Sequence, residues 1–219
     1  MPNLVTHAYI TTEVFPMATP DMIMGSTLPD FAGMFKDYRA STFLLSQYAL
    51  TSELKQGIGF HTATDQVFDL LPLRNQLLAD CRSDSARQLP LLDKKVAGVL
   101  ANIGTDILMD VPILENQKGQ NIYDDLKIAV LSGRTALAET FTPSFTELVQ
   151  RFFATDRPYQ YRDTTWLTEM LQRRFYKRNP RLSFPDELCS GVADMLQRQL
   201  GRIRQHSQVL LTQTIDTLK

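Results

Sequence analysis

Cysteine, charge imbalance and long uncharged runs are what this sequence has least of. Its two cysteines, Cys81 and Cys189, stand far apart and form no CxxC pair, so they predict free thiols rather than a disulfide framework or a cysteine zinc site. Lysine and arginine number 23 against 24 aspartate and glutamate residues. That balance gives no electrostatic reason to expect nucleic acid as a partner.

Segments that would send the chain to or through a membrane are also missing. The N-terminal residues lack the basic region and the continuous apolar core of a secretory signal peptide. No stretch reaches about 18 uncharged apolar residues, the length of a membrane-spanning helix. The hydrophobic fraction of 43% and the charged fraction of 21% are ordinary for a soluble globular protein. We therefore expect a soluble, cytoplasmic protein without a transmembrane helix.

Strand signals are nearly absent. The sequence contains no Asn-Gly or Asp-Gly hairpin turn, and no alternating run is convincing as a strand. It also contains no internal repeat and no linker able to separate domains. At 219 residues the chain is long enough for one sizeable core. We predict an all-α fold, a compact single-domain bundle of about six to eight helices over residues 1–219.

The apolar residues recur mainly at helical spacing. Residues 51–81 predict one long helix with a polar N-cap and a bend near Pro72. Residues 91–111 predict a helix that ends at the following proline, and residues 186–218 predict a final long helix. Residues 3–14 are ambiguous, because their β-branched content favours a strand while their apolar spacing also fits a helical face.

Residues 57–72, GIGFHTATDQVFDLLP, combine polar and apolar side chains in the most unusual way. His61, Asp65 and Asp69 follow one another at intervals of four, so all three line one face of a helix. The apolar neighbours predict that much of this helix is buried, where such groups are costly unless paired, hydrogen-bonded or bound to a metal. A hydrogen-bonded histidine and aspartate without a metal is the structural alternative. Asp69 is expected to be a helix-face charge or a support for the ligands rather than a ligand.

Polar residues in other apolar segments are candidates for the same site. His7 lies in the middle of residues 3–14, and Asp30 lies in an apolar segment where an aspartate is more often a helix cap than a ligand. Asp106 and Asp110 form a carboxylate pair at i and i+4, which is repulsive unless a cation or a proton intervenes. Asp110 is expected at the surface near a helix end.

The chemistry of these groups points to a metal rather than to a nucleophile. The sequence contains no Walker loop and no GxGxxG, GxSxG or HExxH motif. A mixture of imidazole and carboxylate suits Mn²⁺, Mg²⁺ or Fe better than a structural zinc. Such a metal can lower the pKa of bound water and neutralise charge on a phosphate oxygen, which supports phosphoester hydrolysis. The faces that would have to converge carry His7, Asp30, His61, Asp65 and Asp106.

Three blocks of the sequence resemble, in order, the acyl carrier protein phosphodiesterase family, a helical branch of the HD-type metal phosphohydrolases. Residues 3–10, NLVTHAYI, resemble the family's opening block with its histidine, matched by His7. Residues 25–31, GSTLPDF, resemble its Gly-Asn-x-x-x-Asp-Phe block, and residues 57–72 resemble its block with Gly-Ile, His, Asp, Asp and Pro. The matched positions of these two blocks are Gly25, Leu28, Asp30, Phe31, Gly57, Ile58, His61, Asp65, Asp69 and Pro72.

A fourth block is weaker. Residues 101–109, ANIGTDILM, resemble a segment in which an aspartate is followed four residues later by Asp-His, and only Asp106 matches. The departures from the family pattern are Ser26, Thr62, Asn102 and Ile107. Arg74 corresponds to an arginine that often follows the third block. Together the blocks span residues 3–110, whereas the helices expected in residues 122–219 share mainly the general layout.

The resemblance implies an HD-domain-like fold and a specific reaction. Members of the family use a divalent metal such as Mn²⁺ to hydrolyse the phosphodiester between 4′-phosphopantetheine and a serine of acyl carrier protein. By position, Asp30, His61 and Asp106 would be metal ligands, and Asp65 would be a ligand or an orienting group. His7 would be a ligand or a proton donor to the leaving serine oxygen. Mn²⁺ is the expected cofactor, with Mg²⁺ or Fe as alternatives.

A basic cluster in the C-terminal third bears on the choice of partner. Acyl carrier proteins are strongly acidic, so such a cluster could steer and dock one. A solvated cationic helix end, which complements the helix dipole, is the alternative. The cluster consists of Arg173, Arg174, Lys177, Arg178 and Arg181.

Two functions of different classes follow from these observations. The first is a metal-dependent phosphodiester hydrolase acting on acyl carrier protein or on another phosphoester. The second is a non-catalytic helical binding or scaffold protein that keeps the fold without the metal, which Asn102 and Ile107 favour. The retained histidines and aspartates favour the enzyme, because a bundle needing only stability could place apolar residues in the core. We therefore favour the enzyme.

Overall fold

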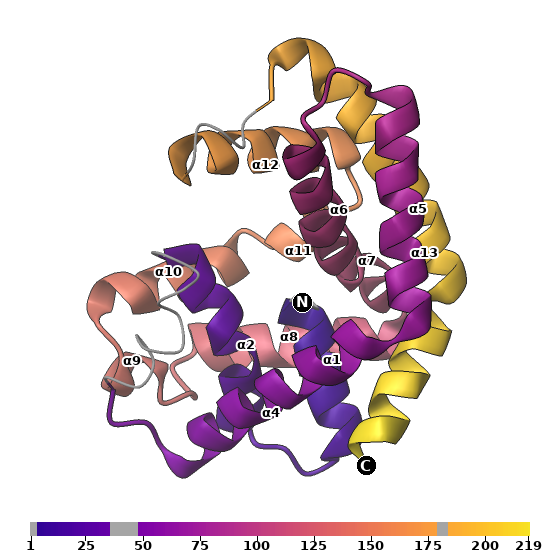
Figure 1. Cartoon of the computed structure of the whole chain (residues 1–219). Helices are drawn as coiled ribbons and strands as arrows, with labels where there is room; N and C mark the ends of the chain where they lie inside the picture. Colours follow the sequence, from indigo (N-terminus) through magenta and orange to yellow (C-terminus); the bar gives the residue numbers. More distant parts are fainter. Residues whose placement is uncertain (1–3, 36–47, 179–183) are drawn as a thin grey trace.

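The computed structural model describes residues 4–35, 48–178 and 184–219, and within these ranges the chain is helical without a strand (Figure 1). This confirms the all-α prediction. The helices outnumber the six to eight expected, because several are only three to five residues long. Their bounds are α1 Leu4–Val14, α2 Pro20–Phe35, α4 Ser52–Leu70, α5 Pro72–Gln88, α6 Lys94–Leu108, α7 Asp110–Leu114, α8 Gln117–Leu131, α9 Leu137–Thr140, α10 Pro143–Ala154, α11 Arg157–Gln160, α12 Thr164–Arg178, η3 Asp186–Leu188 and α13 Cys189–Leu218.

Helix α4 begins as the sequence predicts, but its expected continuation is interrupted. Thr51 is the N-cap, and its hydroxyl accepts the backbone N–H of Leu54 at 3.2 Å. Leu71 has extended backbone angles of φ −64° and ψ 123°, as expected for a residue that precedes a proline. Pro72 then starts α5, where its missing N–H costs nothing. The predicted bend is therefore a break between two helices.

A second proline behaves differently from the prediction. Pro112 was expected to end the helix of residues 91–111, but that helix, α6, already ends at Leu108. Pro112 lies in the first turn of the short helix α7. A proline is tolerated there because the first-turn N–H groups have no partner within the helix.

Residues 94–114 are the one described segment long and apolar enough to cross a membrane. In the folded chain, 72% of this segment's most apolar window is buried against other helices. A buried core helix of a soluble protein meets the same criteria of length and composition. The segment is thus accounted for by packing inside the fold.

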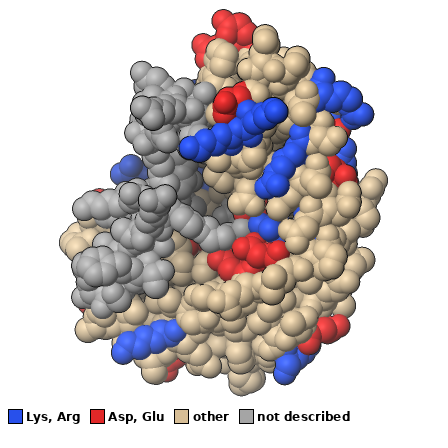
Figure 2. Space-filling view, in the orientation of Figure 1, with Lys and Arg blue, Asp and Glu red and all other residues tan. Residues whose placement is uncertain are grey.

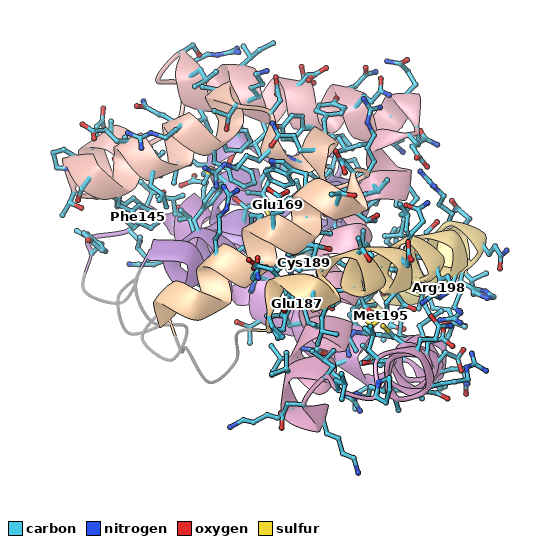
Figure 3. All side chains as sticks on the ribbon, turned by 90° about the horizontal axis from the view of Figure 1, so that it is seen from above. Phe145, Glu169, Glu187, Cys189, Met195 and Arg198 are labelled. Carbon is cyan, nitrogen blue, oxygen red and sulfur yellow. The ribbon has the colours of Figure 1, made fainter. Side chains whose placement is uncertain are left out.

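Helix α13 is the longest element, with 30 residues, and it runs along one side of the molecule (yellow in Figure 1). It packs against α1, α4, α5, α6, α7 and α12. Figure 3 shows from above how α12 lies across the start of α13, with Glu169 close to Cys189. Cys81 and Cys189 are both free, as predicted. Most of the buried apolar side chains of the described helices, including most of those of α13, belong to one core cluster.

Candidate metal centre

The site begins with an unusually close contact between α2 and α4. A Cβ atom added to Gly57 would lie 2.2 Å from the Met22 carbonyl oxygen, and one added to Gly25 would lie 2.5 Å from the Leu54 carbonyl oxygen. Only glycine permits two backbones to approach this closely. The two glycines that open the second and third sequence blocks therefore set the distance between these helices.

This contact fixes the orientation of His61, which follows Gly57 by one helical turn. The Nδ1 atom of His61 lies 2.7 Å from the carbonyl oxygen of Ser26 on α2. A carbonyl can only accept, so Nδ1 carries a proton and donates it. The other ring nitrogen, Nε2, is thereby directed at the carboxylate of Asp65, 3.3 Å away. A hydrogen bond of this kind is typical of imidazoles that must present one nitrogen to a ligand.

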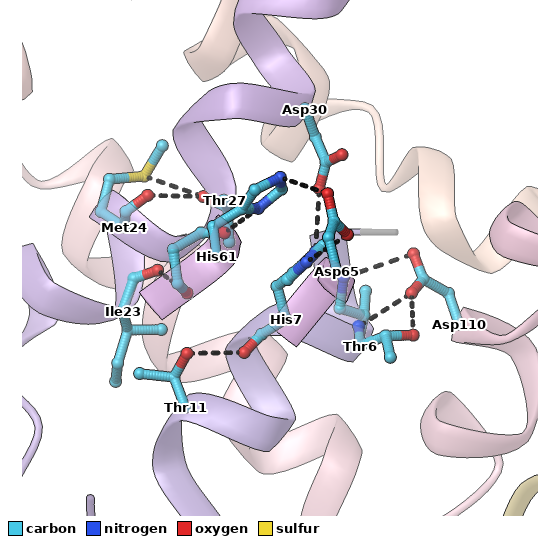
Figure 4. Close-up of polar contacts among 12 residues, drawn as sticks. Thr6, His7, Thr11, Ile23, Met24, Thr27, Asp30, His61, Asp65 and Asp110 are labelled. Atoms are coloured by element: carbon cyan, nitrogen blue, oxygen red, sulfur yellow. Dashed lines mark hydrogen bonds and ion pairs between the residues drawn. The ribbon is translucent and has the colours of Figure 1, made fainter. Parts of the chain in front are cut away.

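Helix α1 adds the second imidazole. The ring of His7 stacks on that of His61, with centroids 3.9 Å apart and an interplanar angle of 23°. Its Nδ1 lies 3.1 Å from Oδ2 of Asp30, and its Nε2 lies 3.3 Å from Oδ1 of Asp65. Asp65 therefore bridges the two imidazoles while Asp30 closes the opposite side of His7 (Figure 4). Three helices thus bring together the four residues that we call the imidazole–carboxylate cluster.

Burial and charge shift the protonation of this cluster. The side chain of His7 is fully buried, and those of Asp30 and Asp65 are 9% and 16% exposed. Burial disfavours the imidazolium of His7, but Asp30 and Asp65 outweigh it and raise the pKa of His7 to about 9. Burial also works against the charged form of Asp65, yet the adjacent imidazoles of His61 and His7 hold its pKa well below the ordinary value. Without a cation, the cluster therefore contains an imidazolium between two carboxylates.

Two polar atoms in the cluster are poorly satisfied, which is relevant to metal binding. His7 Nε2 and Asp65 Oδ1 are buried and lie 3.3 Å apart, but the contact lacks hydrogen-bond geometry and neither atom has another partner. Ligand atoms of His7, Asp30 and His61 lie within 4.8 Å of one another, the one such group among the described residues. Two imidazoles with carboxylates suit Mn²⁺ or Fe better than they suit Mg²⁺. The residues present therefore fit a divalent cation.

Asp106, predicted as a ligand, lies in a different polar group. Its Oδ1 is 3.1 Å from Nη2 of Arg74, which also lies 3.2 Å from Oδ1 of Asn102 and 3.0 Å from Oδ1 of Asp69. Burial raises the pKa of Asp106 to about 6, against the opposing effect of Arg74. Asp69, with a side chain 51% exposed, supports Arg74 and is not among the clustered ligand atoms. The structure thus separates Asp106 from the group that carries both imidazoles. Isoleucine at 107 is buried in the core.

Asp110 corrects another expectation. It was expected at the surface, but it is completely buried. Its carboxylate accepts the backbone N–H of Thr6 at 2.9 Å, the Thr6 hydroxyl at 2.8 Å and the N–H of Val5 at 3.3 Å. These N–H groups belong to the first turn of α1 and have no partner within that helix. Asp110 therefore holds the start of α1 and, with it, His7. Sequence spacing alone gave no signal for this contact over more than a hundred residues.

The basic cluster can be located only in part. Arg173 lies on α12 with an exposed side chain, and it pairs with Glu169 one turn earlier at 3.0 Å. The side chains of Arg174, Lys177 and Arg178, and residue Arg181, lie outside the described part of the chain.

Comparisons with known proteins give no relative. No family model, no curated protein and no solved structure matches this chain. The function is therefore argued from the site itself.

Proposed function

We propose that this protein is a metal-dependent phosphodiester hydrolase similar to the acyl carrier protein phosphodiesterase family, with an HD-domain-like arrangement. One observation carries the proposal: three helices bring His7, Asp30, His61 and Asp65 to one buried place. Four polar groups there stabilise a bundle less well than apolar side chains would. Their presence is more readily explained by binding than by folding.

Within this proposal, His7, Asp30 and His61 hold the cation, for which Mn²⁺ is the preferred candidate. A bound divalent cation supplies a nucleophilic water of lowered pKa and compensates negative charge on the phosphate. Asp65 orients both imidazoles and, because its pKa is low, offers an ionised oxygen to a water molecule. Asp110 and the Ser26 carbonyl keep His7 and His61 in place.

The favoured substrate is the phosphopantetheinyl serine of a holo acyl carrier protein in the cytoplasm. Figure 2 shows Asp and Glu atoms at the floor of a central hollow, with Lys and Arg atoms along its upper side. A strongly acidic protein would be attracted to such basic groups. Of the predicted basic cluster, Arg173 on α12 is the member whose side chain the structure describes.

The test is metal binding followed by hydrolysis. We expect metal-free protein to bind about one Mn²⁺ per chain in a calorimetric titration. Loaded protein should release 4′-phosphopantetheine from holo acyl carrier protein, detected as a mass loss of the carrier. Asp30→Ala and His61→Ala should each abolish both signals, because each removes a ligand.

His206→Ala is the matched control, since His206 lies on α13 outside the cluster. It should behave like the parent. If His61→Ala bound Mn²⁺ and turned over substrate as well as the parent, the assignment of this site would be wrong.

A second candidate is a helical binding or scaffold protein without a metal. It is favoured by the direct pairing of His7 with Asp30, which compensates the imidazolium without any cation. Absence of Mn²⁺ binding at millimolar concentration, together with intact folding, would select this alternative.

A further inference from the structure

Arg74 is a buried cation whose role the metal site does not explain. It lies in the first turn of α5, just after the break at Pro72, and its side chain is only 5% exposed. Its guanidinium carbon lies 5.4 Å from the centroid of the Phe68 ring at the end of α4. Arginine is rarely buried to this extent, and then usually in a paired state.

The polar contacts of Arg74 converge on one of its nitrogens. Nη2 lies within 3.2 Å of oxygens of Asp69, Asn102 and Asp106. These three contacts fix the plane of the guanidinium group between α4, α5 and α6. They leave the Nε–H donor without an acceptor.

The Nε atom, which shares one edge of the guanidinium group with Nη2, is buried and has no hydrogen-bond partner. Leaving a buried donor unsatisfied costs free energy, particularly when the donor is charged. The Arg198 Nε is also unsatisfied, but the Arg198 side chain is 37% exposed and near water. Arg74 is different because its side chain is almost completely enclosed.

Arg74 is also close to the imidazole–carboxylate cluster along α4. Its partner Asp69 follows Asp65 by four residues, so the two carboxylates lie on the same face one turn apart. The guanidinium group therefore lies beside the cluster, on the same face of α4.

We propose that Arg74 is a phosphate-binding residue, whose unsatisfied Nε–H donates to a non-bridging phosphate oxygen of the substrate. A guanidinium N–H forms a charge-assisted hydrogen bond with a phosphate oxygen, and Nη2 on the same edge can add a second one where an oxygen that it now contacts is displaced. Asp69 competes with the phosphate for the guanidinium group of Arg74. Its side chain is half exposed, so the anion can displace it. The choice of a phosphodiester as substrate rests on the proposed function, whereas binding of a phosphate group by Arg74 does not require a metal.

The test follows the Arg74 Nε–H resonance while inorganic phosphate is added to metal-free protein and then to Mn²⁺-loaded protein. Arg74→Lys keeps the positive charge but removes the fork, and it identifies the resonance by its absence. In the parent, phosphate should shift this resonance with saturation, and Arg74→Lys should weaken phosphate binding by about tenfold. Arg87→Lys is the matched control on the same helix, where the arginine side chain is 71% exposed, and it should leave phosphate binding unchanged.

Asp69→Asn provides a second variant that leaves Arg74 in place. Removing the competing charge should tighten phosphate binding by roughly twofold to fivefold. An unshifted Arg74 resonance, equal binding by Arg74→Lys, or no gain in Asp69→Asn would each overturn the inference. Mn²⁺ binding without an Arg74 response would leave the hydrolase proposal standing. Arg74-dependent phosphate binding by a chain that takes up no Mn²⁺ would support this inference and contradict the hydrolase proposal.

Discussion

Two regions of this molecule bury carboxylates between helices, and they do so by different means. In the imidazole–carboxylate cluster, Asp65 faces two imidazoles that are themselves buried. Between α5 and α13, Asp84 is more deeply buried than Asp65, but its partners are arginines whose side chains reach water. Arg87 lies 2.6 Å from Asp84, Arg202 makes a short contact, and Arg198 lies 4.0 Å away.

The difference shows which group is explained by folding alone. Arginines bury their stems and keep their charged heads hydrated, so Asp84 joins α5 to α13 at little desolvation cost. The two imidazoles have no such route to water. The cluster therefore has a cost in stability that the Asp84 group avoids, which is the pattern expected of a binding site.

The largest expected effect comes from separating the helices that support the cluster. Gly57→Ala would place a methyl group 2.2 Å from a backbone oxygen of α2, so the two helices must move apart. We expect a loss of about 3 kcal/mol or more in the free energy of unfolding, measured with denaturant. Gly59→Ala is the matched control, because a Cβ there meets nothing within 4 Å. It should stabilise α4 by about 0.5–1 kcal/mol. Equal effects of both variants would contradict the close contact.

A smaller effect is expected from pH acting on the cluster in metal-free protein. The pKa of His7 is raised from its ordinary value of 6.5 to about 9. The folded state therefore loses this proton at a higher pH than the unfolded state does. This contribution to stability is fully present below pH 6.5 and is lost as the pH rises towards 9, by about 2–3 kcal/mol. Denaturant unfolding between these pH values measures it. His7→Gln should flatten the slope, and an unchanged slope would argue against the imidazolium.

The Asp84 group should respond to pH in the opposite direction and more weakly. Hydrogen bonding by Arg202 lowers the pKa of Asp84, so its contribution is present above the unfolded pKa of about 3.9. It is lost as the pH falls through the still lower folded pKa. Asp84→Asn should cost about 1 kcal/mol at pH 7 and remove this acid sensitivity. Asp80→Asn, one turn earlier and bonded to Gln76, should change little. A similar acid response in both variants would refute the comparison.

Sequence spacing was sufficient for the part of the site that lies on one helix. His61 and Asp65 share a face of α4 because four residues make about one turn. His7 and Asp30 come from other helices, and their approach depends on the glycine contact and on the capping of α1 by Asp110. Those long-range contacts have no local periodic signal.

The surroundings of Asp106 and Asp110 also depend on long-range contacts. Both lie near the junction of α6 and α7, and both are buried. The direction in which α7 leaves α6 decides which carboxylate pairs with Arg74 and which one caps the start of α1. The helical content, by contrast, follows from local composition, and so it was predictable.

The position of α13 in the chain has a consequence for biosynthesis. This helix packs against α1 and α4, the elements that carry three residues of the cluster, yet it is synthesised long after them. Its contacts with α5, α6 and α7 are similarly distant in sequence. A nascent chain that has emerged only as far as α8 therefore exposes apolar surface that α13 will later cover. The helices of the site can form early, but their final packing is completed only when the last of the described helices has left the ribosome.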